Sequence, residues 1–143
     1  MESFKQYLTE STEAEYKIAV DSGNIYTKIY IREPWGTMIL NGQKTIETDR
    51  NRFPSRLIGV PLYVQNEHKM IGGVITISGS KKYNTPEEFD EDFELHKVPK
   101  KSLFHITKRG RTSGWMIDTV KRFDTPIKGA PFRSQYRLQD ANI

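Results

Sequence analysis

The sequence predicts an α+β fold, a small mixed β-barrel with two or more short flanking helices, in which residues 16–143 form a single domain. Three observations support this prediction. About seven short β-prone runs are spread along the chain, and only two short stretches carry helix signals. Strands and helices do not alternate as they do in a parallel β-α-β sheet. A chain of 143 residues can also bury one core without disulfides.

The composition excludes several kinds of site. The chain contains no cysteine, which rules out disulfides, thiol nucleophiles and cysteine-based zinc sites. Its three histidines are scattered, and we expect no metal site and no cofactor. No window approaches the roughly 20 apolar residues of a membrane span. We therefore expect a monomer in the cytoplasm, with no membrane partner.

The charge is distributed unevenly, although the net charge is only +4. Residues 1–15 and 87–94 together hold ten of the 18 acidic residues and one of the 22 basic residues. The remaining chain is strongly basic, which favours a polyanionic partner, nucleic acid before membrane. The alternative is that surface lysines only keep a small protein soluble.

The first elements of the predicted domain are two strands and a short helix. The β-prone runs 16–20 and 25–31 flank four turn-forming residues, which predicts a hairpin. A helix follows over residues 34–42, because Trp35, Met38 and Ile39 recur with helical spacing. Proline suits its first turn, and the glycine at position 42 suits the left-handed conformation that ends a helix.

Lys44 and Glu47 follow on the β-prone run 44–48. Three positions separate them, so a regular strand would place the two side chains on opposite faces. We expect the chain to be still turning after Gly42, which would bring both side chains into one cleft between the 34–42 helix and the barrel. The alternative is that Lys44 and Glu47 form an ion pair with a structural role only.

Further strands are predicted over residues 60–65, 70–77, 115–123 and 132–138. Gly72 and Gly73 indicate a bulge or a close backbone approach. The polar residues 78–83 read as a loop that closes the strand before them.

A second helix is predicted to begin at Thr85, because proline and two glutamates follow this capping residue. Phe89, Phe93 and Leu95 are its expected core contacts. The acidic run 87–94 is then a solvated helix face rather than a metal site.

One segment resembles the signature of ASCH domains, small barrels related to PUA and EVE domains, and two others resemble later parts of the family. Residues 34–47 match the family's helix followed by glycine-x-lysine-x-x-glutamate-x-arginine, through Gly42, Lys44 and Glu47. Asp49 stands where arginine is usual, so Arg50 or Arg52 is the candidate for the missing cation. The stretches 56–64 and 114–126 are similar to later family segments, and the resemblance extends over about residues 27–138. It implies a PUA-like barrel.

The leading functional hypothesis is binding of RNA or of a modified nucleotide in the cleft beside Lys44 and Glu47. Lysine contacts phosphate, and a carboxylate accepts from an exocyclic amine. Trp35 and Trp115 are candidates for stacking on a base, although tryptophan in a small barrel is more often part of the core. Basic loops would contact the backbone. The candidate nucleic-acid-binding residues are Trp35, Lys44, Glu47, Arg50, Arg52, Arg56, Lys108, Arg109, Arg111 and Trp115.

A second hypothesis is an enzyme that acts on a modified cytidine or cleaves RNA. Some ASCH-like proteins hydrolyse N4-acetylcytidine with a lysine, a nucleophilic threonine and a glutamate. Glu47 stands at the position of that threonine, which weighs against this activity. If the chain is an enzyme, its catalytic residues would be Lys44, Thr45 and Glu47, with the lysine activating a hydroxyl.

Residues 1–15 are expected to form an N-terminal leader or docking segment. An apolar stripe of Phe4, Tyr7 and Leu8 would let a terminal helix dock on the barrel. Residues 1–10 also resemble the capsid-targeting leaders of T4-like phages, which are cut after leucine-x-glutamate, as in Leu8-Thr9-Glu10. That resemblance implies a phage protein packed in the virion and delivered to the host cytoplasm. A third hypothesis is therefore a phage protein that inhibits a host protein.

Overall fold

The structure is a computed structural model that describes residues 27–132 and 137–139. Among these residues, six strands form one mixed sheet in the order β2-β5-β4-β3-β1-β6. β1 and β3 run parallel, and the other neighbouring pairs are antiparallel. The strands are β1 (Lys28–Tyr30), β2 (Ile46–Asp49), β3 (Leu62–Gln65), β4 (Met70–Lys82), β5 (Ser113–Lys128) and β6 (Leu138–Gln139). The sheet curves into a half-barrel, which confirms the predicted α+β class.

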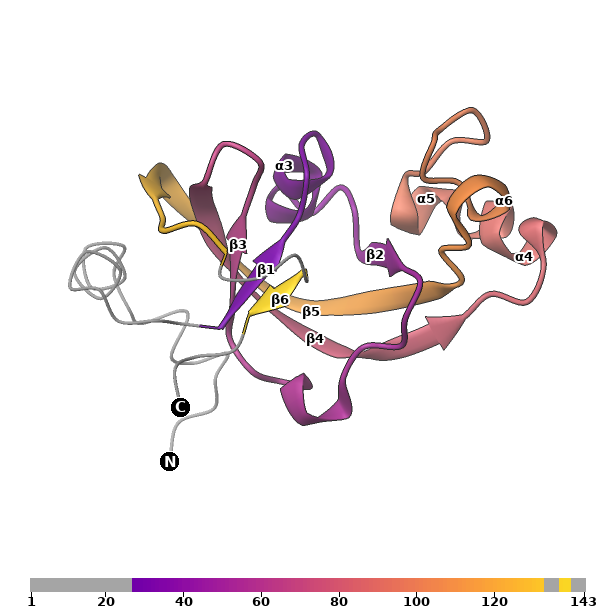
Figure 1. Cartoon of the computed structure of the whole chain (residues 1–143), viewed down its shortest axis with the longest axis horizontal. Coiled ribbons are helices and arrows are strands. Elements are labelled where there is room, and N and C mark those ends of the chain that lie inside the picture. The colour runs from indigo at the N-terminus through magenta and orange to yellow at the C-terminus, as the bar shows by residue number, and fades with distance from the viewer. Residues whose placement is uncertain (1–26, 133–136, 140–143) are drawn as a thin grey trace.

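β4 and β5 form the long hairpin on which the other elements are built (Figure 1). They contain 13 and 16 residues, longer than the predicted strands. The predicted loop 78–83 was wrong, because residues up to Lys82 continue the strand and Lys82 pairs with Ser113. Most side chains at this end are at least partly exposed, so burial leaves no alternating pattern in the sequence.

The predicted bulge at Gly72-Gly73 is confirmed. The pairing register between β4 and β5 shifts between Ile71 and Gly73. A Cβ atom at Gly73 would lie 2.4 Å from the Lys121 carbonyl oxygen and 2.8 Å from a methyl group of Leu40. Glycine is required here because the strand backbone and the helix before β2 approach this closely.

The predicted helix 34–42 is α3 (Trp35–Leu40), which lies above the sheet in Figure 1. Ile39 is fully buried, and Gly42 has a φ of +79°, the left-handed conformation that glycine adopts without strain. A 3-10 helix, η1 (Ser55–Leu57), follows β2.

Three short helices gather at one end of the β4–β5 hairpin (Figure 1): α4 (Pro86–Glu91), α5 (Phe93–His96) and α6 (Ile106–Arg109). Thr85 caps α4 as predicted, since its hydroxyl accepts from the Glu88 N–H. Phe89 is fully buried, but Phe93 and Leu95 are 39% and 41% exposed, so the prediction of core contacts was wrong for both. The helix is interrupted at Asp92, between α4 and α5, so the helical spacing from Phe89 does not continue.

The main core lies between the sheet and α3, and a smaller one lies under α4 and α6. The main core contains Ile29, Ile31, Ile39, Phe53, Leu57, Leu62, Val64, Ile75, Ile77 and Trp115. The smaller one contains Tyr83, Phe89, Val98 and Ile106. The pocket described below is lined by residues of both cores: Trp35 packs against the main core, and Val98 and Phe104 belong to or pack against the smaller one.

Several predictions fall outside the described residues. These are the leader or docking segment 1–15, the first strand of the predicted hairpin, 16–20, and most of the last predicted strand, 132–138. β1 pairs with β3 and with β6 in the described part of the chain. None of the helices described is both long and apolar enough to cross a membrane.

Candidate functional site

The turn after α3 brings Lys44 and Glu47 together. The N–H groups of Gln43 and Lys44 both donate to the Met38 carbonyl, at 2.9 and 3.1 Å, so the chain is still turning at these positions. β2 begins only at Ile46. The Lys44 Nζ atom consequently lies 3.3 Å from the Glu47 Oε1 atom, although a regular strand would have separated them.

Lys44 is a buried cation in polar surroundings. Its side chain has no exposed surface, and its ammonium donates to the carbonyl of His96 at the end of α5. The Trp35 ring lies on another side, with 6.0 Å between Nζ and the ring centroid. Burial lowers the pKa of Lys44, and the charge of Glu47 opposes this shift.

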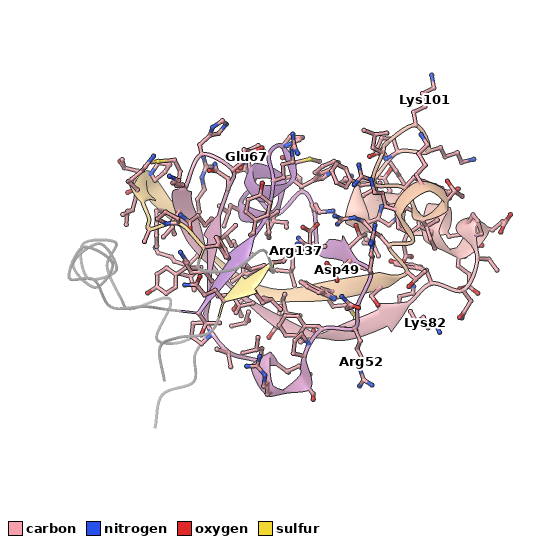
Figure 2. All side chains as sticks on the ribbon, in the orientation of Figure 1. Asp49, Arg52, Glu67, Lys82, Lys101 and Arg137 are labelled. Carbon is pink, nitrogen blue, oxygen red and sulfur yellow. The ribbon has the colours of Figure 1, made fainter. Side chains whose placement is uncertain are left out.

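Arg137, just before β6, connects the two edges of the sheet. Its Nε atom donates to the Tyr30 carbonyl of β1, and its Nη1 atom donates to the Thr48 carbonyl of β2 at 2.8 Å. The same guanidinium pairs with the carboxylates of Asp49, at 3.0 Å, and Glu47. Figure 2 shows Arg137 and Asp49 together at the centre of the molecule.

Glu47 remains ionised between two cations. Burial alone would raise the pKa of Glu47, but the charges of Arg137 and Lys44 hold it below its ordinary value. Its Oε1 atom accepts from Lys44 and from the Thr48 N–H, and its Oε2 atom accepts from Arg137. Both carboxylate oxygens are therefore engaged within the protein.

These charges form part of the lining of a pocket of about 220 Å³ between α3, β2 and the α5–α6 segment. Ligand pockets for drug-sized molecules are commonly about 300–1,000 Å³, so this one suits a smaller group such as a single heterocyclic base or a phosphate. The lining combines aromatic and cationic residues with one carboxylate: Tyr30, Arg32, Trp35, Lys44, Glu47, Thr48, Val98, Phe104, Arg111 and Arg137.

An aromatic pair forms one wall of the pocket. The Trp35 and Phe104 rings meet edge to face, with centroids 5.0 Å apart and planes at 83°. The Arg111 guanidinium lies 4.8 Å from the Phe104 centroid, and the Arg109 guanidinium lies 5.6 Å from it. Arginine stacks on aromatic faces in this way. The wall therefore carries positive charge beside an apolar ring.

Four of the sequence-predicted site residues line the pocket: Trp35, Lys44, Glu47 and Arg111. Three others, Arg50, Lys108 and Arg109, do not line it. Arg109 touches the pocket only through Phe104, and its carbonyl accepts from the Arg50 Nε atom at 2.9 Å. Lys108 donates to the Lys101 carbonyl at 3.1 Å.

The remaining predicted residues lie elsewhere. Trp115 is 2% exposed in the main core, where its indole N–H donates to the Asn51 carbonyl, so it is buried and presents no face to a base. Arg52 and Arg56 are exposed beyond β2, and Figure 2 shows Arg52 pointing away from Arg137. Thr45 is exposed and does not line the pocket, so the predicted catalytic set of Lys44, Thr45 and Glu47 is not assembled.

Arg137 is the main residue that the sequence analysis missed. The cation expected from Arg50 or Arg52 comes instead from Arg137 and Arg111. The available signal was Asp49, a carboxylate where the resemblance expects arginine, because a buried carboxylate requires a cation from another part of the fold. Phe104 was also missed as a lining residue, although it lies among the basic residues of 100–111.

In the described part of the chain, no three histidine or carboxylate side chains are grouped closely enough to hold a metal ion. Of the described histidines, His96 and His105 are buried and engaged in hydrogen bonds within α4–α6.

The fold is that of solved ASCH domains. The structure of an ASCH protein from Zymomonas mobilis superposes with a TM-score of 0.59 at 11% identity, over 72% of this chain and 73% of that one. Two variants of that protein, a serine-to-alanine and a tyrosine-to-phenylalanine substitution, match with TM-scores of 0.58. No protein-family model matches the sequence, and no curated protein matches it. The likeness confirms the resemblance to ASCH domains at the level of the fold.

Proposed function

We propose that this protein binds RNA or another single-stranded nucleic acid through the pocket between α3 and the sheet. The observation that carries the proposal is the composition of the pocket wall. The rings of Tyr30, Trp35 and Phe104 line the same small cavity as the cations Arg32, Lys44, Arg111 and Arg137. Proteins that bind single strands combine these two kinds of group, aromatic faces for the bases and positive charge for the backbone.

The charge around the pocket supports a polyanionic partner. Four cations and one carboxylate line the cavity. Exposed basic residues add positive charge outside the lining. The Arg109 guanidinium lies over Phe104, Arg50 contacts the Arg109 carbonyl, and Lys101 and Lys108 are exposed on the same segment as Phe104. The acidic residues of α4 and α5 lie outside the lining. Such a surface attracts phosphates without regard to sequence and depends strongly on salt.

The aromatic wall supports a contact with one base. The pocket volume of about 220 Å³ leaves room for a single ring system beside Trp35 and Phe104. A base stacked on an aromatic side chain contributes about 1–3 kcal/mol of binding free energy. A modified base is compatible with this arrangement and belongs to the same proposal.

The first experiment measures fluorescence anisotropy with short single-stranded and double-stranded RNA and DNA at about 50 and 200 mM salt. About six phosphate contacts would weaken binding roughly a thousandfold between these concentrations. We expect the tightest binding to single-stranded RNA. No binding to any of the four nucleic acids at the lower salt concentration would contradict the proposal.

A matched pair of variants tests whether the pocket is the binding site. Phe104→Leu keeps an apolar side chain but removes the aromatic face, and we expect roughly tenfold weaker binding. Phe93→Leu makes the same chemical change on α5, outside the pocket, and serves as the control. Equal affinities of the two variants would place the contact elsewhere on the surface.

A hydrolase acting on a modified cytidine is the second candidate, and one observation favours it. Lys44 is a buried amine whose pKa is lowered by burial, as a general base requires. Thr48, unlike Thr45, lines the pocket and would have to supply the hydroxyl. Release of acetate from N4-acetylcytidine, lost in Thr48→Val with RNA binding retained, would support this candidate over simple binding.

A further inference from the structure

The inner end of the pocket offers mainly hydrogen-bond donors. Arg111 has five N–H groups, and among the described residues its side-chain bond goes from Nη1 to the Thr48 carbonyl at 2.8 Å. Lys44 has three N–H groups and directs two of them, to the His96 carbonyl and to Glu47. Most of the Arg111 donors and one Lys44 donor are therefore available to a ligand.

Most acceptor sites at the same place are already used. The Thr48 carbonyl accepts from Arg111 and from Arg137, which occupies both of its lone pairs. Both oxygens of Glu47 accept from protein donors, as described above. The His96 carbonyl accepts from Lys44. Among the described residues, only one lone pair on Glu47 Oε2 and one on the His96 carbonyl are left to accept. A ligand group that enters here therefore meets more free donors than free acceptors, which favours a group that brings acceptors.

The balance of charges also favours an anionic ligand. Glu47 balances Lys44, and Asp49 together with Glu47 balances Arg137. Arg111 forms no ion pair with any described residue, although it is only partly exposed. Burial and the nearby charge of Arg137 lower the pKa of Arg111 below its ordinary value, although the charges of Glu47 and Asp49 oppose the shift, and the arginine stays charged. Within residues 27–132 and 137–139, a positive charge without an ion-pair partner remains at the pocket wall.

We propose that the pocket takes the terminal phosphate monoester of a nucleic-acid strand, with the phosphate on Arg111 and Lys44 and the terminal base against Trp35 and Phe104. This inference rests on the function proposed above and specifies its ligand. A phosphate monoester brings oxygen acceptors and close to two negative charges at neutral pH, whereas an internal phosphodiester brings one. A neutral base edge would leave the charge of Arg111 unbalanced.

The burial of the pocket floor favours the end of a strand over its middle. The Lys44 side chain has no exposed surface, and the side chains of Glu47 and Arg137 are 7% and 19% exposed. A strand that continued past these groups would need room on both sides of the phosphate. A terminal phosphate enters from one side, and its repulsion by Glu47 is reduced because Lys44 and Arg137 already bind that carboxylate.

The experiment compares three forms of one short RNA with an internal fluorophore: a 5′-phosphate, a 3′-phosphate, and hydroxyl groups at both ends. We expect one phosphorylated form to bind about 10–100-fold more tightly than the hydroxyl form, the effect of one or two charge-assisted hydrogen bonds. The two phosphorylated forms show which end is recognised. A nucleoside monophosphate should compete for the site, and the corresponding nucleoside should not.

Arg111→Gln should abolish the preference for the terminal phosphate, because it removes the unbalanced charge and keeps a polar side chain. Arg52→Gln is the matched control, since it removes the same charge from a loop residue that does not line the pocket. The inference is wrong if the three RNA forms bind equally, or if the preference survives in Arg111→Gln. Equal binding that remains sensitive to Phe104→Leu would leave the proposed function intact, and no binding of any form would overturn both.

Discussion

Two clusters of buried and partly buried polar groups meet at His96 of α5, and they differ in how completely their hydrogen-bonding groups are paired. The first is the pocket cluster of Lys44, Glu47, Asp49, Arg111 and Arg137. The second, which we call the closed cluster, contains Tyr83, Asp90, Asp92, His96 and His105 and holds α4, α5 and α6 on the end of the hairpin.

In the closed cluster the donors and acceptors are matched. The Val98 N–H donates to His96 Nδ1 at 2.9 Å, so the ring proton lies on Nε2 and donates to the Phe89 carbonyl. His105 Nε2 lies 2.8 Å from Asp90, and the Tyr83 hydroxyl donates to Asp92 at 2.7 Å. No ligand is needed to complete this set. Satisfied buried networks of this kind fix a unique packing.

The pocket cluster retains donors and one unbalanced cation beside a cavity. Its groups bring three distant parts of the chain together, and it leaves polar atoms directed at solvent or at a ligand. The comparison indicates that burial of charge alone does not mark a functional site in this fold. What distinguishes the proposed site is burial of charge together with donors that no residue in the described part of the chain uses.

Of the variants that test this comparison, Glu47→Gln is expected to lower the unfolding free energy most. This change removes the charge between Lys44 and Arg137 and leaves a buried ammonium without its carboxylate, which typically costs about 3–5 kcal/mol of unfolding free energy. Urea denaturation at pH 7 measures it. The double variant Lys44→Met, Glu47→Leu should recover much of the loss, because it removes both charges. A Glu47→Gln variant as stable as the wild type would show that Lys44 is not charged in the folded protein.

A smaller loss is expected from the closed cluster. Tyr83→Phe deletes the hydroxyl that binds Asp92 and keeps the ring, which packs edge to face on Phe89. We expect the unfolding free energy to fall by about 1–2 kcal/mol. Asp92 keeps its contact with Lys81 at 2.7 Å. RNA affinity should not change in this variant, and a marked loss of affinity would mean that the two clusters are coupled.

Moderate acid should destabilise the closed cluster before it affects the pocket. Burial lowers the pKa of His96 in the folded protein, with a contribution from the charge of Lys44, while Asp92 and Asp90 oppose the shift. The unfolded chain then binds the extra proton near pH 6.5, so stability falls as pH decreases from about 6.5 towards the folded pKa, by at most about 1.4 kcal/mol per pH unit.

Glu47 acts in a lower window, because its folded pKa lies below the ordinary value of 4.5 and its stabilisation is lost only as pH falls below that value. Urea titrations at pH 7.5 and 5.5 test the order. His96→Gln should flatten the decrease between these two pH values, and Glu47→Gln should leave it unchanged. A decrease that persists in His96→Gln would assign it to another group.

The smallest change in stability is expected when the exposed ion pair of Lys97 and Glu94, beside the closed cluster, is removed. Lys97 lies 2.8 Å from Glu94, whose side chain is 82% exposed. Such pairs contribute about 0–1 kcal/mol, so Lys97→Ala should shift the urea midpoint only slightly. A loss comparable to that of Tyr83→Phe would show that the contact of Lys97 with the Phe93 ring also holds α5 in place.

The sequence was sufficient for features that depend on near neighbours. The helical spacing of Trp35, Met38 and Ile39 and the glycine that ends this helix predicted α3 and the turn that joins Lys44 to Glu47. The capping signal at Thr85 predicted the start of α4 for the same reason. These patterns involve hydrogen bonds and contacts within a few residues.

The rest depended on contacts between distant segments, which leave little trace in one sequence. Arg137 reaches Glu47 across 90 positions, and nothing local distinguishes it from the other arginines. Trp115 is a residue type that often stacks on bases, but the pairing of β5 with β2 places it in the core. Phe93 and Leu95 continue the helical spacing of Phe89 in the sequence. The helix is interrupted at Asp92, however, and both side chains are exposed.

The span from Glu47 to Arg137 also has a consequence for how the protein is made. A chain synthesised from its N-terminus can pair β4 with β5 before residue 137 is available, and closing the longest loops is the slow, entropically costly part of folding. Until then Glu47 lacks its ion pair with Arg137, and Arg137 does not yet tie the two edges of the sheet together. We therefore expect that nascent chains acquire a folded hairpin first and the ability to bind a ligand last.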